Sequence, residues 1–432
     1  MDHRSLSRRS LLQMGAAAAA AAAGVRLGAA EPSGMPRAQS AVAGEPLRTR
    51  GLFMHVWDLR DEGVDRVLGW TRDAGLNQVH IAGTYHSGWF VHPGKPQRRL
   101  YMTEGGVLYF PPDPAIFRTT PIQPAVASFV RDTNWLHRAG ERLDRYGLRL
   151  ISWTIGAHNT TLGLRYPEYT QHTAHGDSLP HALSIGHDAV RHYLKAVCRD
   201  LATNYPMYGV QLEAFGWMGA RHGHHHERDL VDLGAAEQGL LGICFNPQTM
   251  QKARAKGIDA DKARATVRDV LDAAFREAPD RPAGHPASVA ELENRAPALK
   301  AYNDFRRELA DSLIIEIKQE ALKGSSCRLL MQGGYQPGIA QAVDGFSSSA
   351  YGRPPEEVLE IVRRGAAALP SAWGGDFPCF IRLGMGVPAT ESQLRAIVVA
   401  LKDGGATGPV FYNYSESPPR MLSWIRTALR GL

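Results

Sequence analysis

From residue 51 onward, the chain alternates between short apolar runs and longer segments in which apolar residues recur at helical spacing. Apolar runs bounded by glycine, proline or polar residues predict buried strands, and apolar positions repeating every three or four residues predict amphipathic helices. The predicted strands are residues 51–57, 76–83, 148–156, 208–216, 327–332, 345–352, 378–384 and 409–414. The predicted helices are residues 63–75, 132–146, 187–205, 354–368, 391–404 and 418–429, with a largely helical segment at 233–323.

Eight strands, each followed by helical material, predict an α/β protein with a (β/α)8 TIM barrel. Such a barrel needs about 250 residues, so the rest of the chain forms insertions, which we expect at about 84–124, a long loop after the second strand, and at 217–325, after the fourth strand. A doubly wound open sheet has the same alternation, but usually carries a glycine-rich nucleotide-binding turn after its first strand. Here Asp58-Leu59-Arg60-Asp61 follows that strand. The sequence therefore favours the barrel, over residues 44–432.

Residues 1–43 have the features of an export signal. Ser7-Arg8-Arg9-Ser10-Leu11-Leu12-Gln13 resembles the twin-arginine motif, an apolar run follows at 14–25, and small residues suited to cleavage lie near 29–30 and 41–43. The run is too short to span a bilayer permanently. An alanine-rich disordered terminus is the alternative. We expect the twin-arginine translocase as a partner during export and a periplasmic or extracellular location.

Net charge and cysteine content argue against two kinds of site, a nucleic-acid-binding surface and a zinc–thiolate site. The formal net charge is +6, but residues 1–43 carry five arginines against two carboxylates, so half of that excess belongs to the export segment. No block of Lys and Arg with interleaved aromatic residues follows, so we expect no nucleic-acid binding. The four cysteines, Cys198, Cys244, Cys327 and Cys379, form no C-x-x-C pair, so a zinc–thiolate site is not expected.

Candidate catalytic groups cluster at the predicted carboxyl ends of the strands, where barrel enzymes carry their active sites. In the fourth strand, alternation places Gln211 and Glu213 toward the barrel interior. A half-buried carboxyl at a strand end suits an acid/base role, because burial raises its pKa. The alternative is a structural carboxylate paired with an arginine. Asp58 follows the first strand and Glu416 follows the eighth, so both are candidate partners for Glu213.

Polar and aromatic residues at the other strand ends predict a cup suited to sugar rings, which have an apolar face and hydroxylated edges. His55 and Trp57 share a face of the first predicted strand, and Arg382 and Asn413 lie in or beside the last two. The predicted substrate-binding residues are His55, Trp57, His80, His86, Trp89, Trp153, His158, Gln211, Arg382, Tyr412 and Asn413.

A histidine-rich run, Arg221-His222-Gly223-His224-His225-His226-Glu227-Arg228-Asp229, follows the fourth predicted strand. It contains enough imidazoles and carboxylates to bind a transition metal. Consecutive histidines point in different directions, however, and the run lacks a defined helical i, i+4 pair framed by a third ligand. We therefore expect a solvated or substrate-contacting loop, with no metal and no cofactor.

Over residues 51–432 the chain resembles the glycoside-hydrolase-like TIM barrels of bacteria. The resemblance rests on the opening segment GLFMHVWDL, on GVQLEAF, on Cys244-Phe245-Asn246-Pro247 and on the closing FYNY. It implies a carbohydrate substrate and an acid/base carboxylate after the fourth strand, the position of Glu213. It also implies a nucleophilic glutamate after the seventh strand, but PCFIRLGMG at 378–386 contains no carboxylate.

The resemblance therefore implies an exported glycoside hydrolase with Glu213 as general acid and with Asp58 or Glu416 as base or nucleophile. Glu227 is a further candidate for this partner. Carboxyl groups about 5–5.5 Å apart would indicate retention of configuration, and about 6.5–9.5 Å inversion. Two alternatives stay open: a metal-dependent sugar isomerase or lyase that uses Glu213 and the 222–226 loop, and a non-catalytic carbohydrate-binding barrel.

Overall fold

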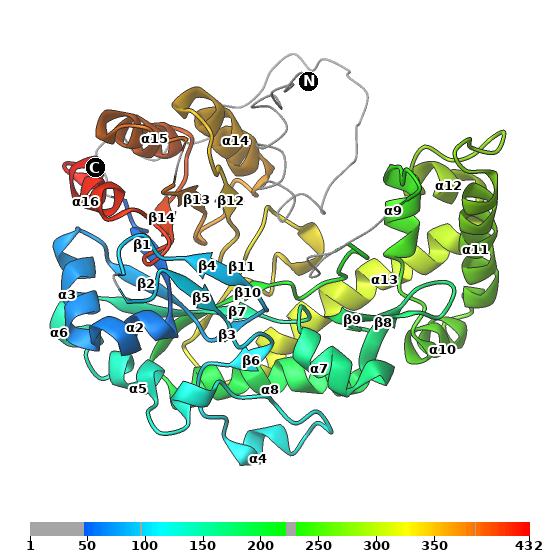
Figure 1. The fold of residues 1–432 in the computed structure, drawn as a ribbon, viewed down its shortest axis with the longest axis horizontal. Helices are drawn as coiled ribbons and strands as arrows, with labels where there is room; N and C mark the ends of the chain where they lie inside the picture. The colour runs from blue at the N-terminus through cyan, green and yellow to red at the C-terminus, as the bar shows by residue number, and fades with distance from the viewer. Residues whose placement is uncertain (1–46, 96, 222–229, 385) are drawn as a thin grey trace, which may run out of the picture. The chain divides into compact units, whose positions relative to one another are not determined.

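Eight parallel strands form the central sheet (Figure 1). The computed structural model describes residues 47–95, 97–221, 230–384 and 386–432. The strands are β1 (Gly51–His55), β2 (Gln78–Ala82), β7 (Arg149–Ile155), β10 (Met207–Glu213), β11 (Arg328–Met331), β12 (Ser348–Ser349), β13 (Pro378–Arg382) and β14 (Gly408–Tyr412). All eight overlap the strands predicted from the hydrophobic pattern.

The strand order is β11-β10-β7-β2-β1-β14-β13-β12, and every pairing in it is parallel. Parallel bridges join Leu330 of β11 to Gly345 and Gly345 to Asp376, so the segment before β12 links the two edges of the sheet. Neighbours in the chain are thus neighbours in the sheet, without the reversal that a doubly wound sheet contains. The sheet is curled as in a TIM barrel.

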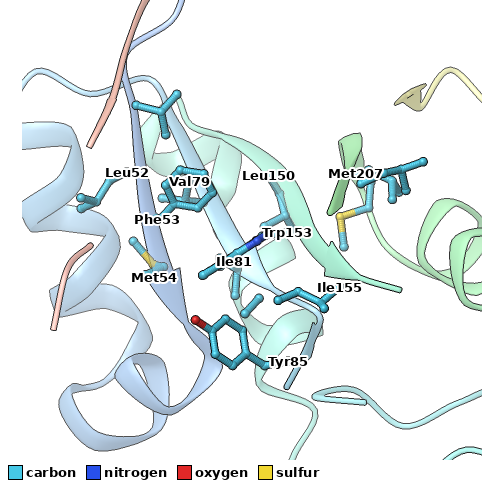
Figure 2. Packing of buried hydrophobic residues seen from close by; sticks show 14 of the residues in the cluster. Leu52, Phe53, Met54, Val79, Ile81, Tyr85, Leu150, Trp153, Ile155 and Met207 are labelled. Carbon is cyan, nitrogen blue, oxygen red and sulfur yellow. The ribbon is translucent and has the colours of Figure 1, made fainter. Parts of the chain in front are cut away.

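The interior of the sheet is packed with aromatic side chains. Phe53 of β1 lies 5.0 Å from the ring of Trp153 on β7 and 5.1 Å from Phe380 on β13, measured between ring centroids. These contacts reach across the curled sheet from both sides of β1. Figure 2 shows Phe53 and Trp153 together with other buried side chains of this part of the sheet, among them Val79 and Ile81 of β2. The core therefore fills the barrel, and only the strand ends are left for a site.

Helices pack outside the strands and cover their outer faces (Figure 1). Amphipathic sequences explain them: in α15, Leu394, Ile397, Val398 and Leu401 form one buried stripe, and the Thr390 hydroxyl caps the helix by accepting from the backbone N–H of Gln393. The helices between sheet strands are α2 (Val56–Glu62), α3 (Val64–Asp73), α5 (Trp135–Gly140), α6 (Leu143–Tyr146), α8 (Asp188–Asn204), α14 (Pro355–Ala368), α15 (Glu391–Asp403) and, closing the chain, α16 (Pro419–Leu429).

Three excursions extend the loops after β2, β7 and β10. The first holds two antiparallel strand pairs, β3–β6 and β4–β5, and the second holds the β8–β9 pair. Their elements are β3 (Thr84–Tyr85), β4 (Trp89–Val91), β5 (Leu100–Met102), β6 (Val107–Leu108), α4 (Pro114–Phe117), η1 (Ser128–Val130), α7 (Thr160–Arg165), η2 (Pro167–Tyr169), β8 (Thr170–His172) and β9 (Ser178–Leu183).

The third excursion, after β10, is helical and has its own hydrophobic core. Phe245 stacks on Tyr302 at 5.0 Å in this core, and the Tyr302 hydroxyl donates to the Cys244 carbonyl at 2.8 Å. Its elements are α9 (Ala235–Leu241), α10 (Pro247–Ala255), α11 (Ala260–Glu277), α12 (Val289–Arg295), α13 (Pro297–Glu316) and the π-helix η3 (Ile317–Ala321); the short η4 (Pro337–Ile339) follows β11.

The structure corrects the sequence prediction at two places that matter for the site. The first strand ends at His55, and Trp57 lies in α2, so the prediction that both residues share a strand face is wrong. The reason is a capping interaction: the Asp58 carboxylate accepts the His55 backbone N–H at 2.9 Å, which starts a helix where apolar residues continue. The predicted helix at 132–146 is two short helices, α5 and α6.

The histidine-rich run 222–229 and the predicted export segment 1–43 lie outside the described residues. Among the helices of the described ranges, none combines the length and apolar character needed to cross a bilayer.

Candidate active site

Glu213 is the last residue of β10 and points into the mouth of the barrel. The Trp153 indole N–H donates to its carboxylate at 2.6 Å, and Gln332, the residue after β11, is a second donor. Burial raises the pKa of Glu213, and the two hydrogen bonds act in the opposite direction. Ala214 follows in the left-handed region, with φ at 56°, a costly conformation for a residue with a Cβ atom. Such backbone strain is concentrated at functional sites.

A chain of buried side chains supports Glu213 from below. His80 donates from Nδ1 to the Gln211 amide oxygen at 2.5 Å, and the Gln211 amide donates to Gln332 at 3.4 Å. Burial lowers the pKa of His80 to about 4, so this imidazole is neutral near neutral pH. His80 and Gln211, predicted to contact substrate, thus lie beneath the site and orient Gln332 toward Glu213.

Glu416 is the second carboxyl at the mouth, in the turn after β14. Asn413 holds it from both sides: the Asn413 amide donates to Glu416 Oε1 at 2.8 Å and accepts the Glu416 backbone N–H at 3.2 Å. Burial, and next the charge of Asp58, raise the pKa of Glu416 to about 8. Glu416 therefore keeps its proton near neutral pH.

Three tyrosines surround the two glutamates. The Tyr85 and Tyr412 hydroxyls lie 3.4 Å apart, and the Tyr351 ring lies 5.8 Å from that of Tyr412. Burial is the main cause that raises the pKa of Tyr85 and of Tyr351, and the charges of both Glu213 and Glu416 raise each further. Both carboxyl groups therefore face the same phenols. β10 and the turn after β14 deliver two carboxyl groups to one aromatic cup.

Asp58 has a different environment. It is fully buried, its Oδ1 forms an ion pair with Lys95, and its Oδ2 accepts the His55 backbone N–H. Burial is the first cause that raises its pKa, and the Lys95 ammonium opposes this. Lys95 also lies 3.8 Å from Asp61 and 3.7 Å from Glu62. Asp58 thus joins α2 to the turn of the β4–β5 hairpin.

His55 and Trp57 are fully buried and back the wall of the cup at Tyr85. Their rings stack at 4.0 Å, and the His55 ring meets Tyr85 edge-on at 5.0 Å. Asn413 donates to His55 Nδ1 at 3.2 Å, which leaves the proton on Nε2. Burial lowers the pKa of His55, so it is a neutral group held by the same amide that holds Glu416.

The other predicted contact residues lie at the rim. His86 stacks on His158 at 4.5 Å, and Arg382 ends β13 with an exposed side chain. Trp89 is 51% exposed, on the opposite face of its strand from Phe90, which packs near His55. Within the described ranges, no group of three or more His, Cys, Asp or Glu side chains is arranged to hold a metal ion.

The sequence reasoning missed three residues of the site: Gln332, Tyr351 and Lys95. Gln332 and Tyr351 each follow a sheet strand, so the rule that barrel sites lie at the carboxyl ends of strands would have found both. Lys95 comes from the excursion after β2, where no local pattern indicates its contact with Asp58.

No protein-family model matches the chain, and no curated protein matches it at a significant level. Similar structures include an α-L-fucosidase isoenzyme 2 from Paenibacillus thiaminolyticus, with 12% identity and a TM-score of 0.52 over 89% of this chain and 49% of that one. The β-galactosidases from Halorubrum lacusprofundi and Marinomonas ef1 each have 12% identity and a TM-score of 0.52 over 88% of this chain, and 57% and 59% of theirs.

The chain thus spans between about a half and three fifths of the length of these enzymes. At such low identity the likeness concerns the fold alone. The chain has the barrel fold on which these sugar-cleaving enzymes are built.

Proposed function

We propose that the protein is an exported glycoside hydrolase in which Glu213 and Glu416 are the catalytic carboxyl pair. The observation that carries the proposal is that two half-buried carboxyl groups, both with raised pKa, face the same two tyrosines, Tyr85 and Tyr351, at the mouth of the barrel. Two carboxyl groups flanking the scissile bond are the usual requirement for glycoside hydrolysis. The fold shared with fucosidase and galactosidase structures agrees with this chemistry.

The environments of the two carboxyl groups suggest a division of roles. Glu416, with a pKa of about 8, holds a proton to give to the leaving oxygen. Glu213 receives two hydrogen bonds that favour its ionised form, from Trp153 and Gln332. We therefore assign Glu416 as general acid and Glu213 as base or nucleophile, the reverse of the sequence expectation. We assign Asp58 a positioning role, because one of its carboxylate oxygens pairs with Lys95 and the other accepts the His55 backbone N–H.

The aromatic cup would bind the sugar. Trp153, Tyr85 and Tyr412 offer aromatic rings and hydroxyl groups, and the buried His55 and Asn413 hold this arrangement from behind. Stacking on the apolar face of a pyranose and hydrogen bonding at its edge use these two features together.

The test is hydrolysis of a panel of dinitrophenyl and unactivated glycosides by the wild type, Glu416→Gln and Glu213→Gln. A dinitrophenolate leaves without protonation, so Glu416→Gln should retain activity on the activated glycoside and lose at least about a hundredfold on the unactivated one. Glu213→Gln should lose both. NMR of the first-formed anomer then separates retention from inversion.

Other outcomes would favour the alternatives. If both variants cleave like the wild type, the assignment is wrong. Sugar binding without turnover on any glycoside would instead support a carbohydrate-binding barrel. Turnover that a chelator abolishes and a divalent metal restores would point to an isomerase or lyase that uses the 222–226 loop.

The export part of the proposal rests on the sequence of residues 7–13. Replacing both Arg8 and Arg9 by lysine should retain the full-length chain in the cytoplasmic fraction of the producing cell. Unchanged export of this variant would contradict the twin-arginine assignment.

A further inference from the structure

The β4–β5 hairpin presents an apolar outer face, formed by Trp89, Val91, Leu100 and Met102. Trp89 pairs with Met102 and Val91 pairs with Leu100, so the four side chains lie on one side of the two-stranded sheet. They are exposed by 51%, 53%, 58% and 70% in chain order. The other large apolar side chains exposed in the described ranges, Leu164, Leu230 and Phe275, lie on separate elements.

The inner face of the hairpin is fixed to the barrel. Phe90 and Tyr101 pair with each other and point inward, and Tyr101 lies 4.6 Å from the Trp57 ring. The buried Lys95–Asp58 ion pair holds the hairpin turn. The hairpin is therefore anchored to the barrel through its inner face and its turn, and its outer face is exposed to solvent.

Cationic side chains border the outer face. Arg98 and Arg99, in the hairpin turn next to Leu100, are exposed. Arg98 lies 3.8 Å from Asp61, and the Arg99 guanidinium donates to the Pro93 carbonyl. The neighbouring carboxylates are less accessible: the side chains of Asp58, Asp61 and Glu62 are 0%, 14% and 23% exposed, against 49% for Arg98. The accessible charge at the turn end of the apolar face is thus positive, whereas the half-buried carboxylate of Glu104, beyond Met102, accepts two hydrogen bonds from Ser128.

We propose that this outer face docks onto an anionic lipid bilayer. A tryptophan with aliphatic neighbours and flanking arginines matches the interfacial region of a bilayer: the apolar side chains enter the acyl boundary and the arginines meet lipid phosphates. A sugar polymer fits less well, because three of the four side chains are aliphatic and give no ring for stacking. A second copy of the chain fits less well too, because a stable interface takes about 20–30 residues from each partner.

Docking would set the active-site wall beside the membrane surface. Phe90, on the inner face, lies 5.6 Å from the His55 ring and 5.7 Å from that of Tyr85. The proposal concerns a binding surface and stands independently of the hydrolysis proposed above, since its readout is vesicle binding.

The test is co-sedimentation of the full chain with vesicles of phosphatidylcholine alone or mixed with phosphatidylglycerol. The wild type should bind the mixed vesicles more tightly, and less tightly as salt rises. Leu100→Ser/Met102→Ser should weaken binding at least tenfold. Arg98→Gln/Arg99→Gln should weaken it about 25-fold on mixed vesicles only, because each arginine near an anionic surface contributes about fivefold, or about 1 kcal/mol.

The matched controls are Leu164→Ser and Arg276→Gln, an exposed leucine on α7 and an exposed arginine on α11, which should bind as the wild type does. Thermal unfolding of each variant checks its folding. Residues 1–43 are present in every protein, so binding that the hairpin substitutions leave unchanged would overturn the proposal. So would hairpin substitutions that abolish binding to an insoluble polysaccharide, or self-association, but not binding to vesicles.

Discussion

Glu416 couples the chemistry of the site to the stability of the fold. Its folded pKa of about 8 lies above the ordinary value of 4.5, so the folded state holds a proton that the unfolded state releases between these values. The stability contributed by the protonated group is complete below pH 4.5 and is lost as pH rises through about 8. Glu416→Gln cannot ionise. The free energy of unfolding of this variant, relative to that of the wild type, should therefore increase by about 1.4 kcal/mol for each pH unit across this window.

Denaturant unfolding of both proteins at a series of pH values measures this difference. Glu357→Gln on α14, where the carboxylate is exposed and pairs with Arg353, is the control and should show no comparable trend. A constant difference between Glu416→Gln and the wild type at all pH values would show that Glu416 ionises normally in the folded protein.

Trp153 should tune the acidic limb of the pH–activity profile. Its indole N–H donates to Glu213 at 2.6 Å and favours the ionised carboxylate. Trp153→Phe keeps a ring against Phe53 but removes this donor, so the pKa of Glu213 should rise and the acidic limb should move up by about one pH unit. The pH dependence of the rate of glycoside hydrolysis measures this shift. An acidic limb that does not move would show that the ionisation of Glu213 does not determine it.

At the scale of elements, the buried Asp58–Lys95 pair attaches the β4–β5 hairpin to α2. Removing one partner leaves an unpaired buried charge, which costs about 3–5 kcal/mol. Asp58→Asn should therefore lower the free energy of unfolding by that order, reduced to the extent that Asp61 and Glu62 take over Lys95. The double variant Asp58→Asn/Lys95→Met should recover part of the loss. Equal stability of Asp58→Asn and the wild type in urea would contradict this role.

At the scale of the whole molecule, α13 connects two hydrophobic cores. Its residues Leu299, Tyr302 and Phe305 belong to the core of the helical excursion, whereas Leu313 and Ile314 belong to the barrel core. Leu271→Ala on α11 touches only the excursion core and should cost about 2–5 kcal/mol there. We expect faster hydrogen exchange in α9 to α12 and unchanged exchange in β1, β2 and β7. A uniform increase in both parts would show that the two cores unfold as one.

Much of the site could be read from strand ends, because side-chain alternation and the barrel rule are local. Glu213, Trp153 and Tyr412 were predicted in this way, and the structure gathers them around one cup. Trp57 shows the limit of this reasoning. The apolar run at 51–57 predicts a strand throughout, but the Asp58 carboxylate accepts the His55 backbone N–H and a helix begins after His55. Asp58 was predicted from its position, but position alone does not reveal that Lys95 neutralises it.

The sequence by itself determined the order of the eight sheet strands and of most helices that follow them, since apolar periodicity, caps and turn residues act within a few residues of one another. It also determined which side chains stand at the strand ends. Only the tertiary structure decided how far each carboxyl group is desolvated, because burial depends on elements distant in the chain. Glu416, Asn413 and His55 meet through β1 and β14, the two ends of the sequence brought together by barrel closure. The same pairing brings Asp58, which forms an ion pair with Lys95, close enough to Glu416 for its charge to raise the pKa of Glu416.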